Sequence, residues 1–335
     1  MNPSIRRQVL TLGLSGLIGG VASPGRLFAQ AAAQALPESA RILVGFPAGG
    51  APDVVARRLA EQLTGKLARA VVVDNRPGAG GRIAVNVARQ SAPDGTTLLL
   101  NPAGILTINP HSYGKLDYDP FTDFAPLSLA AQIDFGFAVG PAVPESVRTL
   151  ADFIGWAKAN LGKVTFGSPA AGAPPHFVGD AFSRVAQLQL THVPYRGAAP
   201  AINDLLGGQV SALVLTLGDL IQHARAGKIR LLAATGPQRS RFAPELPTFG
   251  EQKITSLEMR DWFGVYIAGK PEAPVQVRVG GLVRAAATAA AYVSGLAASS
   301  LDAASSTSEE LDRLARAELE RWRPIVAASG FKAEN

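Results

Sequence analysis

Cysteine is absent from this chain of 335 residues, which excludes disulfides, thiolate nucleophiles and cysteine-based metal sites. Histidine is scarce: the four histidines stand at positions 111, 176, 192 and 223, and no two have the spacing of a metal-binding pair. Charged residues make up only 17% of the chain, and no run of lysine and arginine with interleaved aromatic residues occurs. A nucleic-acid partner is therefore not expected, and the sequence predicts neither a metal nor a cofactor.

The N-terminus carries the features of an export signal. Arg6 and Arg7 precede an apolar run at residues 9–18, and a small-residue cleavage site, A-Q-A, follows at residues 29–31. We therefore expect residues 1–31 to be a signal peptide and the mature protein to reside in the periplasm. The adjacent arginines fit twin-arginine export, while the general secretory route and an uncleaved anchor are the alternatives. Three of the six net positive charges lie in this leader, which leaves about +3 on the mature chain.

The stretch from residue 41 to residue 59 is the one around which the rest of the chain is organised. It begins with an apolar run at residues 42–44, passes through a turn that contains Gly49 and Gly50, and continues with apolar residues at helical spacing. This pattern predicts a strand, a glycine turn and a helix. Backbone N–H groups at the start of a helix, together with the helix dipole, form a seat for a carboxylate or phosphate. The turn is either such a seat or an ordinary connection whose glycines serve only the backbone geometry.

The order of strand, glycine-rich loop and helix recurs along the chain. After the first unit, strands at 70–74 and 96–100 and a helix at 83–89 predict a parallel α/β sheet, with an irregular loop at 101–113 over its carboxyl edge. A single strand at 126–139 is then expected to lead away from this sheet. The middle block is expected to contain helices at 149–159 and 198–206 and another ending near 226, and strands at 163–166, 190–195, 210–215 and 229–234.

Two α/β lobes with a cleft between them are predicted from this order. The chain returns with an apolar strand at 262–268, and two helices at 275–296 and 308–328 are expected to pack back on the first lobe. Thr307 and Glu310 have the spacing of a capping box, which marks the start of the last helix. We predict residues 38–137 plus 262–335 as lobe 1 and residues 138–261 as lobe 2, joined by two crossover strands.

Seven sequence blocks carry a resemblance to a known family. The first four are G-F-P-A-G-G-A-P-D at 45–53, V-V-V-D-N-R-P-G-A-G-G at 71–81, P-D-G-T-T-L-L at 93–99 and Y-D-P-F-T-D-F-A-P at 118–126. The other three are H-V-P-Y-R-G-A-A-P-A at 192–201, D-L-L-G-G-Q-V at 204–210 and A-G-K-I-R-L-L-A at 226–233. In this order the chain resembles the Bug family of periplasmic solute-binding receptors of tripartite tricarboxylate transporters. The resemblance implies a periplasmic binding protein fold, a type 2-like Venus flytrap that closes on a small carboxylated solute. It also implies delivery to inner-membrane transporter subunits or, alternatively, to a membrane sensor kinase.

The resemblance further implies which residues contact the solute, because loops at helix starts on both lobes hold the carboxylate in that family. Asp53 is either a contact or an N-terminal helix acid, and Arg196 is either a cleft cation or a solvated turn charge. His176 has a structural role in the first helical turn or contacts the solute. Tyr195 lines the cleft or fills the second lobe. The implied site residues are Phe46, Pro47, Ala48, Gly49, Gly50 and Asp53 on the first lobe, and Ser168, Ala170, Gly172, His176, Tyr195 and Arg196 on the second.

Several positions depart from the family pattern and make the predicted cleft less polar. Pro52 and Ala173 stand where many members carry hydroxyl residues, and the prolines at 174–175 remove two backbone donors. Leu215 replaces an acid of the family. We therefore expect a monocarboxylate or aromatic acid rather than a citrate-like polyacid as the solute, bound by a monomer.

An exported α/β enzyme is the alternative from another class. The chain contains neither a G-x-S-x-G elbow nor a phosphate-binding P-loop, and residues 78–83 depart from the dinucleotide fingerprint because Ile83 stands at the last glycine position. Ser168 follows a glycine but has no histidine and aspartate at a recognised spacing. Binding without catalysis is the expectation.

Overall fold

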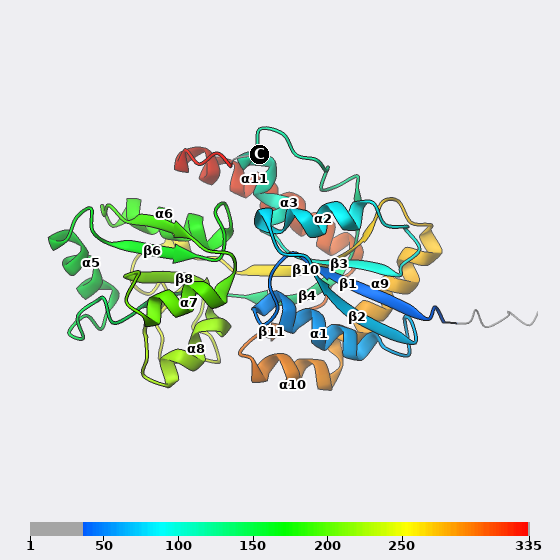
Figure 1. Ribbon diagram of the computed structural model, residues 1–335, viewed down its shortest axis with the longest axis horizontal. Helices are drawn as coiled ribbons and strands as arrows, with labels where there is room; N and C mark the ends of the chain where they lie inside the picture. The colour runs from blue at the N-terminus through cyan, green and yellow to red at the C-terminus, as the bar shows by residue number, and fades with distance from the viewer. Residues whose placement is uncertain (1–35, 334–335) are drawn as a thin grey trace, which may run out of the picture. The chain divides into compact units, whose positions relative to one another are not determined.

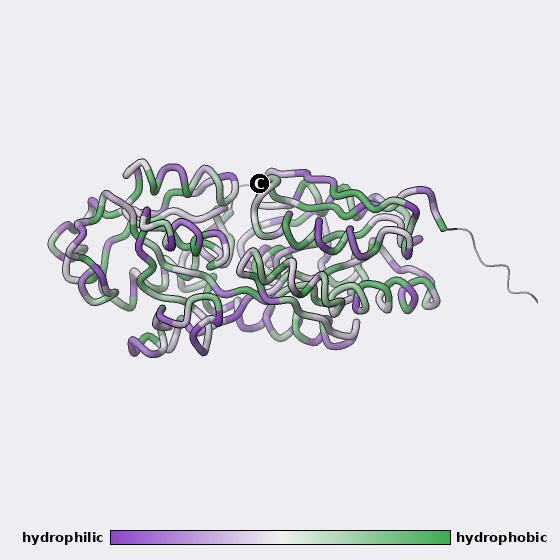
Figure 2. The backbone as a smooth tube through the Cα atoms, turned by 90° about the horizontal axis from the view of Figure 1, so that it is seen from below, coloured by the Kyte–Doolittle hydropathy of each residue, from purple (hydrophilic) through white to green (hydrophobic). Residues whose placement is uncertain are grey.

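Each of two lobes is built on its own β-sheet with helices on both faces, as the computed structural model shows (Figure 1). The structure describes residues 36–333, so the predicted signal peptide at residues 1–31 lies outside the described residues. Seen from below in Figure 2, the backbone narrows between the lobes, and hydrophobic segments run through the inside of each.

The first sheet has the strand order β11-β4-β10-β3-β1-β2. Strand β1 pairs in parallel with β2 and β3, whereas β10 lies antiparallel between β3 and β4. The predicted parallel sheet is therefore only partly correct, because β4 and β10 are the strands that connect this lobe to the other. The strands are β1 Ser39–Val44, β2 Ala70–Asn75, β3 Thr97–Pro102, β4 Phe124–Ile133, β10 Asp261–Ala268 and β11 Asp302–Ala303.

Helices cover both faces of this sheet, and alternate residues of β1 show how. Ile42 and Val44 belong to one cluster of buried residues with helices α1, α9 and α10, whereas Leu43 belongs to another with α2, α3 and α11. A strand buried on both faces reads as a continuous apolar run, which is why this segment is recognisable in the sequence. The helices are α1 Ala51–Leu63, α2 Arg82–Arg89, α3 Gly104–Thr107, α4 Asn109–Ser112, α9 Ala273–Thr288, α10 Ala290–Ala298 and α11 Ser308–Ser329, with a short 3-10 turn at Ala79–Gly81.

The second sheet has the order β7-β6-β8-β5-β9. Strand β6 is parallel to β7 and β8, and β5 is antiparallel to β8 and β9. The strands are β5 Phe135–Val139, β6 Thr165–Ser168, β7 Thr191–Pro194, β8 Ala212–Thr216 and β9 Arg230–Ala234. The helices are α5 Leu150–Ala159, α6 Pro174–Val185, α7 Ala198–Leu206 and α8 Leu217–Arg225, and a 3-10 turn lies at Thr255–Leu257.

Two neighbouring crossings connect the lobes. The expected single strand at 126–139 is in fact two strands, β4 and β5, which separate at Asp134 because each joins a different sheet. The return crossing runs beside it: Met259 N–H donates to Thr235 O, and Thr235 Oγ1 accepts the Phe135 N–H. The Arg260 guanidinium contacts the Asp134 carboxylate at 3.0 Å, so an ion pair joins the two crossings.

The C-terminal helices differ from the prediction in one respect. The expected helix at 275–296 is divided into α9 and α10 at Ala289, whose backbone is extended. The capping box of Thr307 and Glu310 at the start of α11 is confirmed. None of the described helices is by itself long and apolar enough to cross a membrane, and only the bent pair α9 and α10 reaches that length and composition together.

The last helix reaches both lobes. Helix α11 begins against β4, and its final turns lie beside α6 of the second lobe. The ring centroids of Trp322 and Phe177 are 5.8 Å apart, and Phe331, just beyond α11, packs edge-on against His176. The C-terminus thus adds a third connection between the lobes.

Candidate ligand site

The turn between β1 and α1 is held by Asp53, the third residue of the helix. Its Oδ2 accepts the Gly49 N–H at 2.9 Å and the Arg57 Nε–H at 2.8 Å, and its Oδ1 accepts from the Asn75 amide at 3.0 Å. Burial of this carboxyl works to raise its pKa, but the hydrogen bonds from Arg57, Gly49 and Asn75 together keep the pKa below its ordinary value. Asp53 is therefore ionised, and its hydrogen bonds hold the glycine turn in place.

Three helices of the second lobe also begin at the carboxyl ends of strands. Helices α6, α7 and α8 follow β6, β7 and β8, which are neighbours in the parallel part of the sheet. Their first turns therefore gather at one edge of the sheet, where α/β proteins bind ligands. This edge faces the first turn of α1 from the other lobe, as Figure 1 shows.

The four helix starts differ in the backbone donors that they offer. Pro174 and Pro175 occupy the first two positions of α6, and the next amide, of His176, donates to Ala173 O at 2.9 Å. By contrast, α7 begins after Gly197 with Ala198 and Ala199, both of which line the cavity between the lobes. Among the helix starts of the second lobe, α7 rather than α6 is therefore the one suited to an anion.

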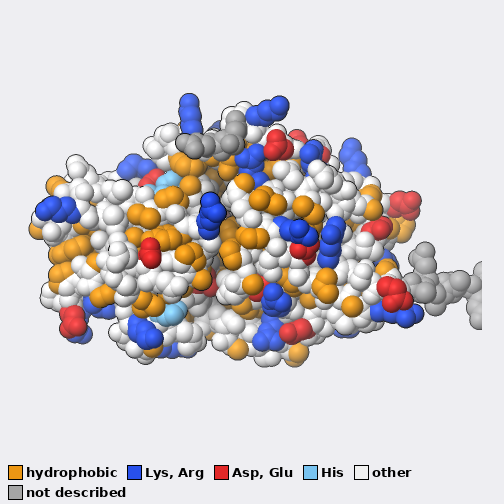
Figure 3. All heavy atoms as spheres, in the orientation of Figure 1, with side chains coloured by type: hydrophobic (Ala, Val, Ile, Leu, Met, Phe, Trp, Pro, Cys, Tyr) orange, Lys and Arg blue, Asp and Glu red, His pale blue; other side chains and the backbone are white. Residues whose placement is uncertain are grey.

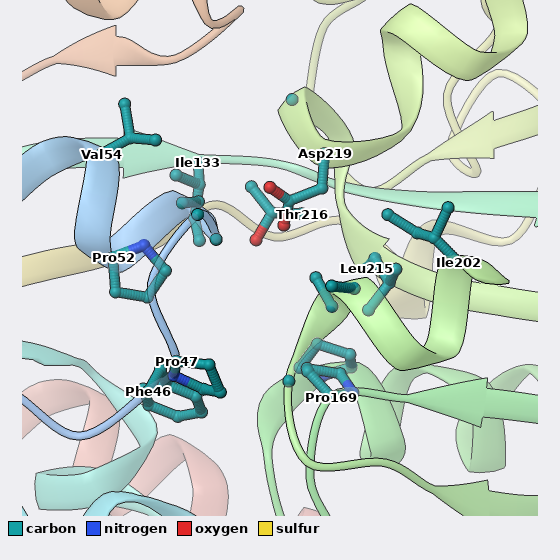
Figure 4. A pocket seen from close by; sticks show the side chains of 18 of the residues that line it. Phe46, Pro47, Pro52, Val54, Ile133, Pro169, Ile202, Leu215, Thr216 and Asp219 are labelled. Atoms are coloured by element: carbon teal, nitrogen blue, oxygen red, sulfur yellow. The ribbon is translucent and has the colours of Figure 1, made fainter. Parts of the chain in front are cut away.

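This cavity between the lobes has a volume of about 510 Å³. Its wall is mostly apolar, and proline is frequent in it. Figure 4 shows Phe46, Pro47, Pro52, Val54 and Ile133 of the first lobe on one side and Pro169, Ile202, Leu215, Thr216 and Asp219 of the second on the other. Figure 3 shows hydrophobic side chains at the surface on both sides of the boundary between the lobes. The cavity has the size and apolar character of a small-molecule site.

Half of the implied site residues line this cavity. Five of them belong to the turn between β1 and α1 on the first lobe, and the sixth is Arg196 on the second lobe. Asp53 does not line the cavity, because it lies buried behind the turn. Ser168, Ala170, Gly172, His176 and Tyr195 do not line the cavity. The residues that line it are Phe46, Pro47, Ala48, Gly49, Gly50 and Arg196.

The second-lobe residues outside the cavity form a buried polar cluster. Ser168 Oγ lies 2.7 Å from His192 Nε2 and also contacts Ala170 O at 3.0 Å. The His192 ring stacks on His176 with centroids 3.8 Å apart, and His176 Nδ1 accepts the Gly172 N–H. Burial, followed by the neighbouring His176, lowers the pKa of His192 to about 3. Ser168 is fully buried, whereas His192 is partly exposed, so the serine hydroxyl itself is not accessible to a substrate.

Tyr195 is also directed into the second lobe. Its hydroxyl donates to Asp204 Oδ2 at 2.8 Å, and its ring packs with a buried cluster that includes Leu205 and Leu213. Burial, with the Asp204 hydrogen bond, raises the pKa of Tyr195 to about 12. Its neighbour Arg196 is exposed, and it stands at the entry to α7.

Two acids in the cavity wall were missed by the sequence reasoning. Asp219, in the first turn of α8, accepts a hydrogen bond from the Ala51 N–H at the start of α1. Burial raises the pKa of Asp219 to about 7, although this hydrogen bond works to lower it. Burial likewise raises the pKa of Asp261 to about 7, opposed chiefly by the Trp262 N–H. Their positions, just after β8 and at the start of β10, could have identified them, because the ends of these strands adjoin the cleft.

The described residues offer no evident metal site. Among residues 36–333, no group of three or more histidine, aspartate and glutamate side chains is placed to hold an ion.

The two lobes, the two crossings and the cavity between them define a solute-binding protein of the periplasmic type. Residues 55–331 match the family described as "Tripartite tricarboxylate transporter family receptor", and the chain belongs to this family. The predicted family and the two-lobed fold are thereby confirmed, and the chain is a solute-binding receptor.

Individual relatives agree with this assignment. The chain is 32% identical over 286 residues to a Pseudomonas sp. (strain P51) protein described as "UPF0065 protein in tcbD-tcbE intergenic region", covering 85% of this chain and 84% of the relative. It is similar to the structure of R. palustris Rpa4515 with adipate, with a TM-score of 0.83, 27% identity, and coverage of 88% and 98% of the two chains. It is also similar to the periplasmic binding protein BugD, with a TM-score of 0.82, 27% identity, and coverage of 88% and 99%.

Proposed function

We propose that this receptor works in the periplasm, where it captures a small carboxylated solute in the interlobe cavity and delivers it to the membrane subunits of a tripartite transporter. The observation that carries the proposal is the meeting of the α1 and α7 starts, one from each lobe, at the wall of a cavity of about 510 Å³. Backbone amides at helix starts favour an anion. At α1 the Ala51 N–H is already engaged by Asp219 and Pro52 has no N–H, so the start of α7, with Arg196 beside it, supplies most of the attraction. The similarity to a protein whose structure holds adipate supports a carboxylate as the ligand class.

The charge of the cavity favours a monocarboxylate or an aromatic acid over a polyacid. The titratable residues that line it are two acids, Asp219 and Asp261, one arginine, Arg196, and one histidine, His223. A citrate-like solute would place three negative charges near these acids, which costs free energy in a partly desolvated site. The apolar remainder of the wall suits an aliphatic or aromatic body.

The protein binds its solute without converting it, as a monomer. The serine and histidine pair of the second lobe, Ser168 and His192, supports this view because Ser168 is closed off from the cavity. A nucleophile needs access to its substrate.

The proposal is tested on the mature protein by native mass spectrometry and titration calorimetry. We expect the purified protein to retain a small organic acid, and hexanoate or benzoate to bind at least tenfold more tightly than citrate. Absence of any bound acid, with no heat from these acids, would refute the receptor site. Citrate as the tightest ligand would refute the preference alone.

A further inference from the structure

Asp219 faces the cavity, and within the described part of the chain no lysine or arginine forms an ion pair with it; His223, one turn further along α8, lines the same cavity. Figure 4 shows its carboxylate beside the Thr216 side chain, opposite Ile133 of the first lobe. Among residues 36–333, the one group found to favour the ionised carboxylate is the Ala51 N–H. Asp261, itself only 5% exposed, adds a second acid to the same wall. Carboxylates in such surroundings are costly unless something positive pairs with them.

The local structure does not need this carboxylate. An acid at the third position of a helix often takes part in a capping box, but Thr216, the N-cap of α8, makes no such hydrogen bond. Asp219 instead reaches across the cleft to Ala51 of α1. An asparagine could also accept that hydrogen bond through its Oδ1. The remaining structural role of the negative charge is its interaction with the dipole of α8, which offsets only part of the cost of burying it.

Arg196 and the start of α7 lie at a distance from Asp219. Arg196 and the α7 start follow β7, and Asp219 follows β8, with β6 between these two strands. Neighbouring strands are about 4.8 Å apart, so the two helix starts are separated by roughly 10 Å. A solute that reaches both would carry opposite charges at its two ends.

We propose that the solute bears an ammonium group, several bonds away from its carboxylate, and that Asp219 pairs with this ammonium group while Arg196 and the α7 start hold the carboxylate. This inference rests on the proposed function and specifies its substrate class as an aminocarboxylate with separated charges. The cavity wall between the two ends, with Ile202 and Leu215, packs against the aliphatic or aromatic body.

Three acids of equal chain length test the inference: hexanoate, 6-aminohexanoate and adipate, which end in a methyl, an ammonium and a second carboxylate group. Calorimetry at pH 8 should show that 6-aminohexanoate binds the wild-type protein at least tenfold more tightly than hexanoate, with adipate weakest. Asp219→Asn should abolish this advantage while hexanoate affinity stays within about twofold. Glu145→Gln, which removes an exposed acid of the same lobe outside the cavity, should leave the advantage intact.

The outcomes separate the two proposals. Binding of hexanoate or adipate as tightly as 6-aminohexanoate, or an unchanged preference in Asp219→Asn, overturns the inference and leaves the carboxylate receptor standing. Failure of all three acids to bind, with no retained acid in native mass spectrometry, overturns both. A thermal melt of each variant confirms that it is folded.

Discussion

Acids at helix starts have different roles in the two lobes. Asp53 and Asp219 are both acids in the first turn of a helix, but their surroundings differ. Asp53 accepts hydrogen bonds from Gly49, Arg57 and Asn75, whereas Asp219 has the single backbone donor of Ala51. Asp53 therefore stabilises a turn in the first lobe, whereas Asp219 has a raised pKa at the cavity wall of the second; acids with raised pKa values in clefts are candidates for functional positions.

The free energy that the ionised Asp219 carboxylate costs the folded protein can be measured from the dependence of stability on pH. Its pKa in the folded protein is about 7, above the ordinary value of 3.8, so the folded state holds this proton more tightly than the unfolded chain does. Stability therefore falls as pH rises from about 4 to about 7 and stays lower above that. Asp219→Asn should raise the free energy of unfolding by about 1–2 kcal/mol at pH 8, after allowance for the partial exposure of this side chain to the cavity.

Thermal melts of the ligand-free protein at pH 8 and pH 4.5 check this prediction. The variant should melt a few degrees higher than the wild type at pH 8, and the difference should shrink at pH 4.5, where the wild-type carboxyl is protonated. The other groups of the cavity, Asp261, His223 and Arg196, are common to both proteins and cancel in the comparison. A variant that melts lower at pH 8 would show that the charge is stabilised by a group in the fold.

Whole elements were easier to predict than their ends. The apolar run of β1, the glycine turn and the buried face of α1 follow one another within a short segment, so local pattern sufficed there. The break between β4 and β5 has no distinctive local signal, because Asp134 is only one of three polar residues in this mostly apolar stretch. The division arises from pairing with distant strands. The separation of α9 from α10 at Ala289 lies in a run of alanines, where neither glycine nor proline marks it.

For the ligand site too, local sequence patterns predicted single turns but not which of them come together. From its own sequence the first-lobe turn was predicted only as an anion seat or an ordinary connection, since strand, glycine and helix follow directly; its contact with the solute was implied by the family resemblance. On the second lobe, the loop at 167–176 resembles that turn, but its prolines at 174–175 close α6 to a ligand. Which of three helix starts faces the cavity depends on the order β7-β6-β8, and Asp219 enters the wall for the same reason. Such neighbours are set by tertiary packing.

The proposed role of the α7 start can be tested by removing one backbone donor. Ala199→Pro deletes an N–H at the second position of α7, where α1 already carries Pro52 without loss of the helix. We expect hexanoate affinity to fall about tenfold, since a hydrogen bond to a charged group contributes roughly 1.5–3 kcal/mol. Titration calorimetry measures the change.

Ala151→Pro is the matched control for this variant. It places proline at the second position of α5, outside the cavity, and should leave affinity unchanged. Equal affinity of Ala199→Pro and the wild type would exclude the α7 amides as the anion seat, and Arg196 would then be the remaining candidate on the second lobe.

At the scale of the whole molecule, glycines without a side chain allow the two lobes to approach each other closely. A Cβ atom at Gly197 would lie 3.1 Å from Pro47 Cδ, and one at Gly218 would lie 2.8 Å from Ser299 O. Together with the crossings at Asp134 and Arg260, these contacts describe a closed arrangement around the cavity. Hinged lobes that close on a ligand bind it more tightly when closure is unhindered.

Gly104→Ala tests whether closure contributes to binding. Gly104 begins α3 of the first lobe, and a Cβ atom there would lie 2.8 Å from Cδ of Pro174, the first residue of α6 in the second lobe. Its backbone angles suit any residue, because its φ is not positive. A Cβ atom would also lie 3.3 Å from Ile108 Cδ1 of the same lobe, but that is the flexible end of a side chain, so the main penalty falls on the closer contact between the lobes. We expect hexanoate affinity to fall about tenfold, in line with the roughly 1–3 kcal/mol cost of overpacking a close contact.

Small-angle scattering distinguishes this effect from a general loss of structure. The wild type should become more compact when hexanoate is added, and Gly104→Ala should do so less at the same ligand concentration, while its ligand-free melting temperature stays close to that of the wild type. Gly155→Ala is the control, because Gly155 lies within α5 and a Cβ atom there meets nothing within 4 Å. If affinity and compaction are unaltered in Gly104→Ala, the contact between Gly104 and Pro174 accommodates the methyl group without a cost in free energy. Binding would then be explained by the first-lobe turn and the α7 start, without a contribution from closure.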